Sequence, residues 1–271
     1  MTRVVCIGDS ITAALPWWDE PPELLEACVR GIATVADRLV ALDGAYARYP
    51  DGTPASPPIQ AETIERVAAE VGLECLILTP HRLWRGQVEK RTYLLAAASV
   101  GSDWLVVVDA DHLIRADRAP VRAELASYGP DIDIVSVTFH TPLNDKRPIA
   151  ECIATNWHLD HADRTMQMSH IIRALPGLRV EGKHWQYSAI KDDRRVNLYY
   201  GDDHARDHAL KPHFLAAPYA IEHVTLHRDD LRIKRGRAFC NDRIKVVDLT
   251  GQEDDAPGLP PPEWDYTTVP Y

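Results

Sequence analysis

Two aspartates directly after an apolar run are the residues of this chain best suited to chemistry. Asp109 and Asp111 follow residues 104–108, with the small Ala110 between them. In an extended backbone, residues two apart project to the same side, so both carboxylates point together. Hard divalent cations prefer oxygen ligands, and an ion held by one or two carboxylates completes its shell with substrate phosphates and water. The pair predicts a metal site for a diphosphate; a capped turn with a solvated second aspartate is the structural alternative.

The segments before this pair alternate between strand and helix patterns. Strands are predicted at residues 3–7, 38–42, 73–78 and 104–108, with helices after Pro21, around residues 64–71 and over 87–100. This alternation is typical of an open parallel sheet with helices on both faces, in which ligand sites lie at the carboxyl ends of the strands. We therefore expect an α/β fold with its functional residues after strands.

The second half of the chain has a looser pattern. Another strand is predicted at residues 132–139, and residues 169–174 and 178–181 flank a Pro-Gly turn, as a hairpin would. This half is expected to be more antiparallel. From residue 250 the sequence is rich in proline without periodicity, which indicates an extended tail.

Composition restricts the class of protein. The 271 residues include 30 basic and 40 acidic ones, a net charge of −10, which opposes non-specific attraction to nucleic acid. No apolar run approaches the ~18–20 residues of a membrane helix, and the N-terminus has no signal-like apolar region, so a cytoplasmic protein without membrane insertion is expected. The five cysteines are widely spaced and fit reduced packing residues.

One stretch carries a family resemblance. The segment GQVEKRTYLLAAASVGSDWLVVVDAD, together with the opening strand and the ALDGAY segment, resembles GT-A glycosyltransferases of the large inverting family that uses nucleotide-sugar donors. The resemblance spans residues 4–114. It implies a GT-A fold, with a Rossmann-like, mostly parallel sheet, helices on both faces and antiparallel additions on the acceptor side. A single catalytic domain would then cover residues 1–249, divided into a nucleotide-sugar half at 1–115 and an acceptor half at 116–249, before a tail at 250–271.

The resemblance also implies roles for individual residues. Asp109, Ala110 and Asp111 match the family's DxD, which binds Mn²⁺ or Mg²⁺ against the donor diphosphate. Asp43 matches the acidic residue that contacts the base or ribose. Arg91, preceded by Lys90, matches the basic residue that faces the donor phosphates, and both are assigned to nucleotide-sugar binding. A late histidine commonly completes the metal site; we assign His223, with His227 as the alternative. A turn residue for Asp43 and a solvated helix face for Arg91 are the structural readings.

The acceptor side is less defined. An inverting transfer needs a base to take the acceptor proton, and the acidic pair found late in many family members has no clear counterpart here. The segment LPGLRVEGKHWQYSAIKDDRR resembles the acceptor-side hairpin of some bacterial and phage members, which makes Glu181 and His184 the candidates. Other candidates for the base are Asp192, Asp193, Asp202 and Asp203. We expect a UDP-sugar donor and an acceptor that is a glycan, lipid, protein or modified nucleobase; the oligomeric state stays open.

Other functions remain as alternatives. The block CIGDSITA is close to the opening block of SGNH hydrolases, in which Ser10 would be the nucleophile after the first strand. Their late Asp-x-x-His is absent, because the one such motif, at Asp109 and His112, lies mid-chain. Two histidine pairs have helical spacings that suit zinc, but no HExxH accompanies them: His158 with His161, and His204 with His208. A catalytically silent nucleotide-sugar-binding module is the remaining alternative.

Overall fold

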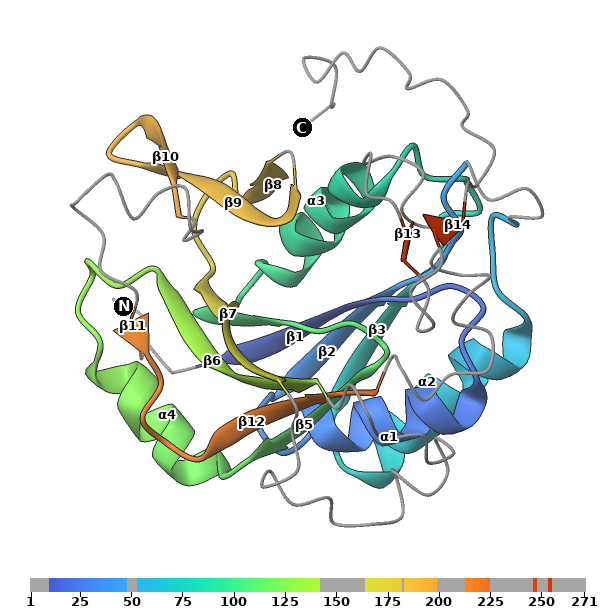
Figure 1. Cartoon of the computed structure of the whole chain (residues 1–271), viewed down its shortest axis with the longest axis horizontal. Coiled ribbons are helices and arrows are strands. Elements are labelled where there is room, and N and C mark those ends of the chain that lie inside the picture. The colour runs from blue at the N-terminus through green and yellow to red at the C-terminus, as the bar shows by residue number, and fades with distance from the viewer. Residues whose placement is uncertain are drawn as a thin grey trace, which may run out of the picture.

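The computed structural model describes residues 10–47, 53–141, 164–181, 183–198, 213–224, 246–247 and 253–254 (Figure 1). The helices are α1 (Pro22–Ile32), α2 (Pro58–Glu70), α3 (Gln87–Ala98) and α4 (Arg118–Ser127). The strands are β1 (Ile11–Pro16), β2 (Arg38–Leu42), β3 (Glu74–Leu78), β4 (Trp104–Val107), β5 (His112–Ala116), β6 (Ile134–Thr141), β7 (Arg164–Arg173), β8 (Arg179–Glu181), β9 (Lys183–Lys191), β10 (Arg194–Asn197), β11 (His213–Phe214), β12 (Tyr219–His223), β13 (Val246–Val247) and β14 (Glu253–Asp254).

A large, mostly parallel sheet forms the centre of the part of the chain that the structure describes. Its strand order is β3-β2-β1-β4-β7-β6-β12-β5, and β11 pairs beside β6. The strands β1 to β4 are mutually parallel, β7 runs antiparallel between β4 and β6, and β5 runs antiparallel to β12. The predicted α/β class is therefore confirmed, and antiparallel strands enter in the second half as expected.

Helices cover both faces of this sheet. Along β1, β2 and β4, alternate side chains enter two separate cores, as the pleat of a strand requires. One core is shared with α1, α2 and α4; the other is shared with α3 and with the small sheet formed by β8, β9 and β10 (Figure 1). Because both faces of these strands are buried, their sequences are continuous apolar runs rather than alternating apolar and polar residues. No helix among the described residues is long and apolar enough to cross a membrane.

Most predicted elements of the first half match the structure. The predicted strand at residues 3–7 lies outside the described residues and stays a prediction. The first strand that the structure describes is β1 at Ile11–Pro16, in the ITAALP segment, and every residue of it is buried. The sequence does not predict this strand, because the small residues Ala13 and Ala14 weaken its apolar signal.

The predicted hairpin around Pro176 and Gly177 is wrong. Strand β7 pairs with β4 and β6, whereas β8 pairs with β9, so the two segments belong to different sheets. Gly177 does turn the chain with a positive φ of 61°, but the turn carries it from one layer to the next. Strand β8 instead pairs with the next strand, β9, and a second hairpin joins β9 to β10 through Asp192 and Asp193, which both have positive φ. In the predicted tail, β14 pairs with β13.

Helix α1 approaches β5 very closely at Gly31. A Cβ built on Gly31 would lie 2.9 Å from the backbone nitrogen and oxygen of Ile114. Ile114 belongs to β5, the edge strand beside β12, and its backbone atoms cannot move aside like the end of a flexible side chain. We expect Gly31→Ala to lower the free energy of unfolding by about 1–3 kcal/mol through overpacking, measured by urea unfolding.

Gly129 provides the control for this substitution. A Cβ on Gly129 meets no atom within 4 Å, and its φ is not positive. Gly129→Ala should therefore change the free energy of unfolding little. Equal effects of the two substitutions would contradict the close packing of α1 on β5.

Candidate functional site

The predicted acidic pair lies in the turn between β4 and β5, at the carboxyl edge of the parallel strands. Val108 is held to β1 by its N–H donating to the Ala14 carbonyl, and the chain then turns through Asp109, Ala110 and Asp111 into β5. The two aspartates are partly exposed, whereas Ala110 is buried. This is the edge at which ligand sites of open α/β sheets lie.

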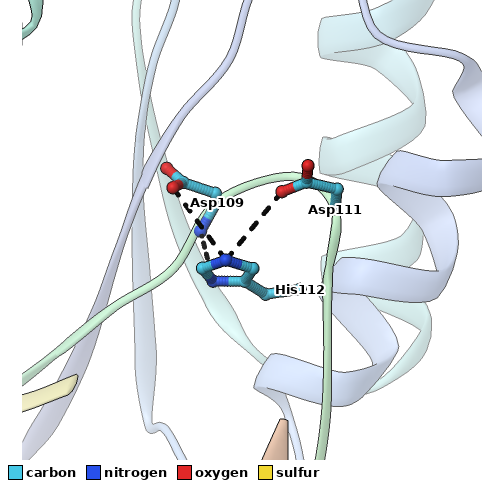
Figure 2. Close-up of side chains that lie close together, drawn as sticks. All are labelled: Asp109, Asp111 and His112. Carbon is cyan, nitrogen blue, oxygen red and sulfur yellow. Dashed lines mark hydrogen bonds and ion pairs between the residues drawn. The ribbon is translucent and has the colours of Figure 1, made fainter. Parts of the chain in front are cut away.

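His112 completes a compact group with the two aspartates (Figure 2). Its Nε2 lies 4.0 Å from Asp109 Oδ2 and 3.9 Å from Asp111 Oδ1. One ligand atom from each of the three residues lies within 4.8 Å of the others, and two oxygens on opposite sides of Ca²⁺ or Mg²⁺ are separated by roughly 4–5 Å. The donor set therefore fits a divalent cation that prefers oxygen, as the sequence predicts.

Arg91 reaches this group from α3. Its Nη2 donates to Asp109 Oδ1, and the guanidinium is buried. Burial alone would lower the pKa of Arg91, but the neighbouring Asp109 carboxylate outweighs it, and the pKa stays above its usual value. Its Nε has no hydrogen-bond partner among the described residues. A buried cation with an unused donor thus lies beside the acidic pair.

Two further rings pack against His112. The His112 ring meets Phe139 and His170 edge to face, with centroids 5.2 and 5.0 Å away, and all three side chains are buried. His170 lies at the β-bulge where β7 shifts register against β6. Neither of its nitrogens makes a hydrogen bond of good geometry within the described residues; burial, followed by the neighbouring His112, lowers its pKa to about 3, and the Val107 backbone opposes this lowering only in part. The ring is therefore neutral.

Strand β12 brings the predicted histidine to the same turn. The Val224 N–H donates to the Asp111 carbonyl, and His223 is the Cα partner of His112 in the β12–β5 ladder. The backbone of His223 thus lies beside the acidic turn. Its side chain, and the whole of His227, lie outside what the structure describes, so the choice between them stays a prediction.

The side chains of Asp43, after β2, and Lys90, in α3, form hydrogen bonds with backbone groups of nearby loops. The Asp43 carboxylate, 2% exposed, accepts from the Gly44 N–H and from both the N–H and Oγ of Ser56. Lys90 donates from Nζ to the carbonyls of Trp17 and Gly44 at 2.6 and 2.7 Å. Both residues close the loop that follows β2, and their predicted contacts with a nucleotide stay predictions.

The two candidates for the catalytic base lie in the small sheet. Glu181 ends β8, and its Oε1 accepts from Arg179 and from Ser188 Oγ at 2.5 Å each. Its described contacts are thus within the small sheet rather than with the acidic turn. His184 lies in β9, and its side chain is outside the described residues. That small sheet is joined to α3 by the Val180 N–H, which donates to Thr92 Oγ1.

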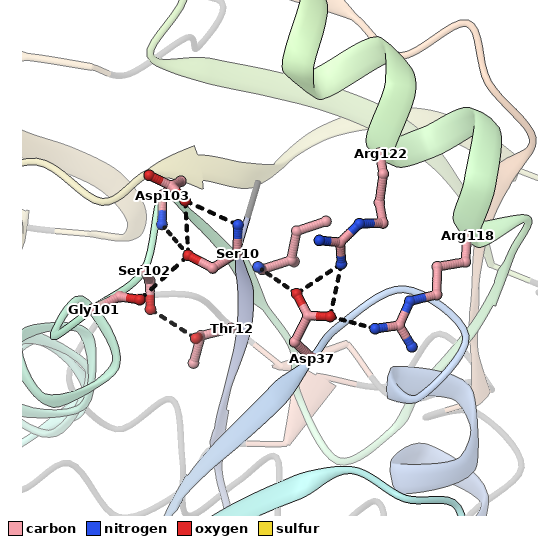
Figure 3. Close-up of polar contacts among 9 residues, drawn as sticks. Ser10, Thr12, Asp37, Gly101, Ser102, Asp103, Arg118 and Arg122 are labelled. Atoms are coloured by element: carbon pink, nitrogen blue, oxygen red, sulfur yellow. Dashed lines mark hydrogen bonds and ion pairs between the residues drawn. The ribbon is translucent and has the colours of Figure 1, made fainter. Parts of the chain in front are cut away.

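Ser10 lies at the amino end of β1, whereas Asp109 and Asp111 follow the carboxyl end of the neighbouring strand β4 (Figure 3 shows the surroundings of Ser10). It precedes β1, and its Oγ donates to Asp103 Oδ2 at 2.8 Å and accepts from the Asp103 N–H. The SGNH-type alternative places a nucleophilic Ser10 after the first strand, and the one Asp-x-x-His of the sequence is at Asp109 and His112. Those two residues instead lie beyond the other end of β4, so the geometry gives no support to Ser10 as a nucleophile.

No family model and no curated protein sequence matches this chain. The GT-A resemblance therefore stays a prediction about the sequence, and the site must be judged by its geometry. The histidines proposed for zinc, at positions 158, 161, 204 and 208, lie outside the described residues.

The sequence reasoning missed the contribution of His112 and His170 to this site. His112 directly follows the DAD segment, and it was considered only as part of a rival motif. A histidine that directly follows an acidic turn could have been predicted to join the site, because at the first residue of the next strand its ring stays close to the two carboxylates. His170 gave no local signal: a bulge and a long-range strand pairing bring it there.

Lys90 generates a prediction about pH. Burial lowers its pKa in the folded protein to about 7 from the ordinary lysine value of 10.5. Between these pH values the unfolded chain binds the proton and the folded protein does not, so stability should rise as pH increases. The free energy of unfolding should gain about 1 kcal/mol per pH unit relative to Lys90→Met, which lacks the amine. Urea unfolding of both proteins from pH 6 to 9.5 measures this difference, and a flat difference would contradict the buried amine.

His170 generates a second prediction. Its ring is a buried polar group without a described partner, and an unmade hydrogen bond of this kind costs about 1–3 kcal/mol. His170→Leu, which keeps a similar volume, should raise the free energy of unfolding by about 1 kcal/mol. His213→Leu, at a half-buried position of β11, should give no such gain. A clear loss of stability in His170→Leu would show that the ring holds a partner.

Proposed function

We propose that the protein is a metal-dependent glycosyltransferase that uses a nucleotide-sugar donor, in a GT-A type fold. The observation that carries the proposal is the convergence of Asp109, Asp111 and His112 at the carboxyl edge of the parallel sheet. A four-stranded parallel half with helices on both faces, followed by strands of mixed direction, agrees with the fold that the sequence resemblance implies. Mn²⁺ or Mg²⁺ is the proposed cofactor and a UDP-sugar the proposed donor.

The chemistry assigns a distinct task to each charged residue. Asp109 and Asp111 would hold the cation; when bound, it neutralises charge on the departing nucleoside diphosphate. Arg91 pairs with Asp109 beside the acidic pair, and we propose that its guanidinium contacts a phosphate oxygen of the donor there. A buried Arg contributes more to such a contact than an exposed one because water screens it less.

The loop after β2 would form the wall of the nucleotide site. Asp43 and Lys90 fix this loop through buried hydrogen bonds, and Trp84 Nε1 donates to the Asp43 carbonyl at 2.9 Å. We propose that these residues set the shape of the wall from behind, while the loop backbone meets the nucleoside. For the base that deprotonates the acceptor, His184 and Glu181 remain the proposals, with inversion at the anomeric carbon.

The acidic pair provides the main test. Asp109→Asn and Asp111→Asn each remove a carboxylate that would bind the cation, and each should abolish the Mn²⁺-dependent stabilisation by donor. A donor at roughly a hundred times its Kd adds about 2.7 kcal/mol to the native state, which shifts the melting temperature by several degrees. Thermal-shift measurements with UDP-, GDP-, dTDP- and ADP-sugars, with and without Mn²⁺, decide the donor and the metal requirement together.

The matched control is Asp131→Asn, which removes the same charge from an exposed position. It should keep the full shift. Donor binding that is unchanged in EDTA, or unchanged in both site variants, would overturn the proposal.

A further inference from the structure

The hydrogen bond between the Asp109 backbone and His112 restricts what His112 can do. The Asp109 N–H donates to Nδ1 of His112 at 3.1 Å. The donor here is a backbone amide, which always carries its hydrogen, so Nδ1 must be the acceptor. A neutral imidazole has a single N–H, and an acceptor at Nδ1 places that hydrogen on Nε2.

The protonated Nε2 faces the two carboxylates. It lies almost equally far from Asp109 and Asp111, as Figure 2 shows. A metal ion binds the lone pair of an imidazole nitrogen, and a protonated nitrogen has none to offer. In this arrangement Nε2 can direct its N–H toward carboxylate oxygens, but it cannot ligate the cation that they hold.

The surroundings oppose a change of ring orientation. The ring is enclosed edge to face by Phe139 and His170, and it is buried. Rotating it by half a turn would exchange Nδ1 for a carbon and leave the Asp109 N–H without its acceptor. Ligation through Nε2 with Nδ1 protonated would set two N–H groups against each other. Both changes cost a buried hydrogen bond.

We infer that His112 is the positioning residue of the metal site, and that the cation takes its protein ligands from Asp109 and Asp111 rather than from His112. This inference rests on the proposed function. Nδ1 closes the turn that carries Asp109, and Nε2 faces the two carboxylates from 4.0 and 3.9 Å. Without the His112 nitrogen in the ligand set, the site should favour Mg²⁺ and Mn²⁺ chemistry over that of ions that prefer imidazole, such as Zn²⁺.

Two substitutions separate positioning from ligation. In His112→Asn the side-chain oxygen takes the place of Nδ1. It can still accept from the Asp109 N–H, while no atom remains at the position of Nε2. In His112→Gln the polar end lies near the ε position, and the acceptor is lost. We expect His112→Asn to bind Mn²⁺ within about threefold of the parent, and His112→Gln and His112→Ala to bind at least tenfold more weakly, by calorimetry on the full chain.

A spectroscopic measurement keeps the test independent of any loss of stability. Electron spin echo measurements on bound Mn²⁺ detect directly coordinated nitrogen, and the signal should be the same in the parent and in His112→Asn, whatever His223 contributes. Loss of a nitrogen signal in His112→Asn, or binding by His112→Gln but not by His112→Asn, would overturn the inference and leave the metal-dependent transferase standing. A parent protein that binds no Mn²⁺ would overturn both.

Discussion

The repulsion between the carboxylates of Asp109 and Asp111 is the constraint around which this edge of the molecule is arranged. Two like charges a few ångströms apart and partly withdrawn from water repel strongly, because low-dielectric surroundings screen them less. Arg91 from α3 compensates this charge through its contact with Asp109 Oδ1, and Nε2 of His112, at the start of β5, lies 4.0 and 3.9 Å from the two carboxylates. If an ion binds as proposed, its carboxylate ligands are already close together.

This compensation depends on contacts between distant parts of the chain. Arg91 reaches Asp109 only because α3 packs on the face of the sheet opposite to α1 and α2, and the buried Lys90 next to it ties α3 to the loop after β2. On the other side, β12 fixes the Asp111 carbonyl through the Val224 N–H. The charged residues of the site are thus brought together by contacts from α3, from the central sheet and from β12.

Sequence patterns could predict the frame of this site but not its contacts. The predicted strand at residues 38–42 matches β2, and the predicted helix after Pro21 and the acidic turn after β4 are present, because continuous apolar runs, proline at a helix start and carboxylates after a strand are local signals. The pairing of β7 between β4 and β6 was not predictable, since it joins residues far apart in sequence and contains a bulge. The same limitation hid His170, and it led to the incorrect hairpin at Pro176.

The position of the acidic turn also depends on the helix behind it. Cys28 in α1 directs its Sγ toward the Asp109 carbonyl at 3.6 Å, and Gly31, one helical turn later, lets α1 contact the backbone of β5. Burial raises the pKa of the Cys28 thiol well above its usual value, so it acts as a small packing group rather than a nucleophile. A side chain at Gly31 would meet the backbone of β5, the strand that begins at His112. His112 itself is held by the local turn, in which its N–H donates to the Asp109 carbonyl while its Nδ1 accepts from the Asp109 N–H.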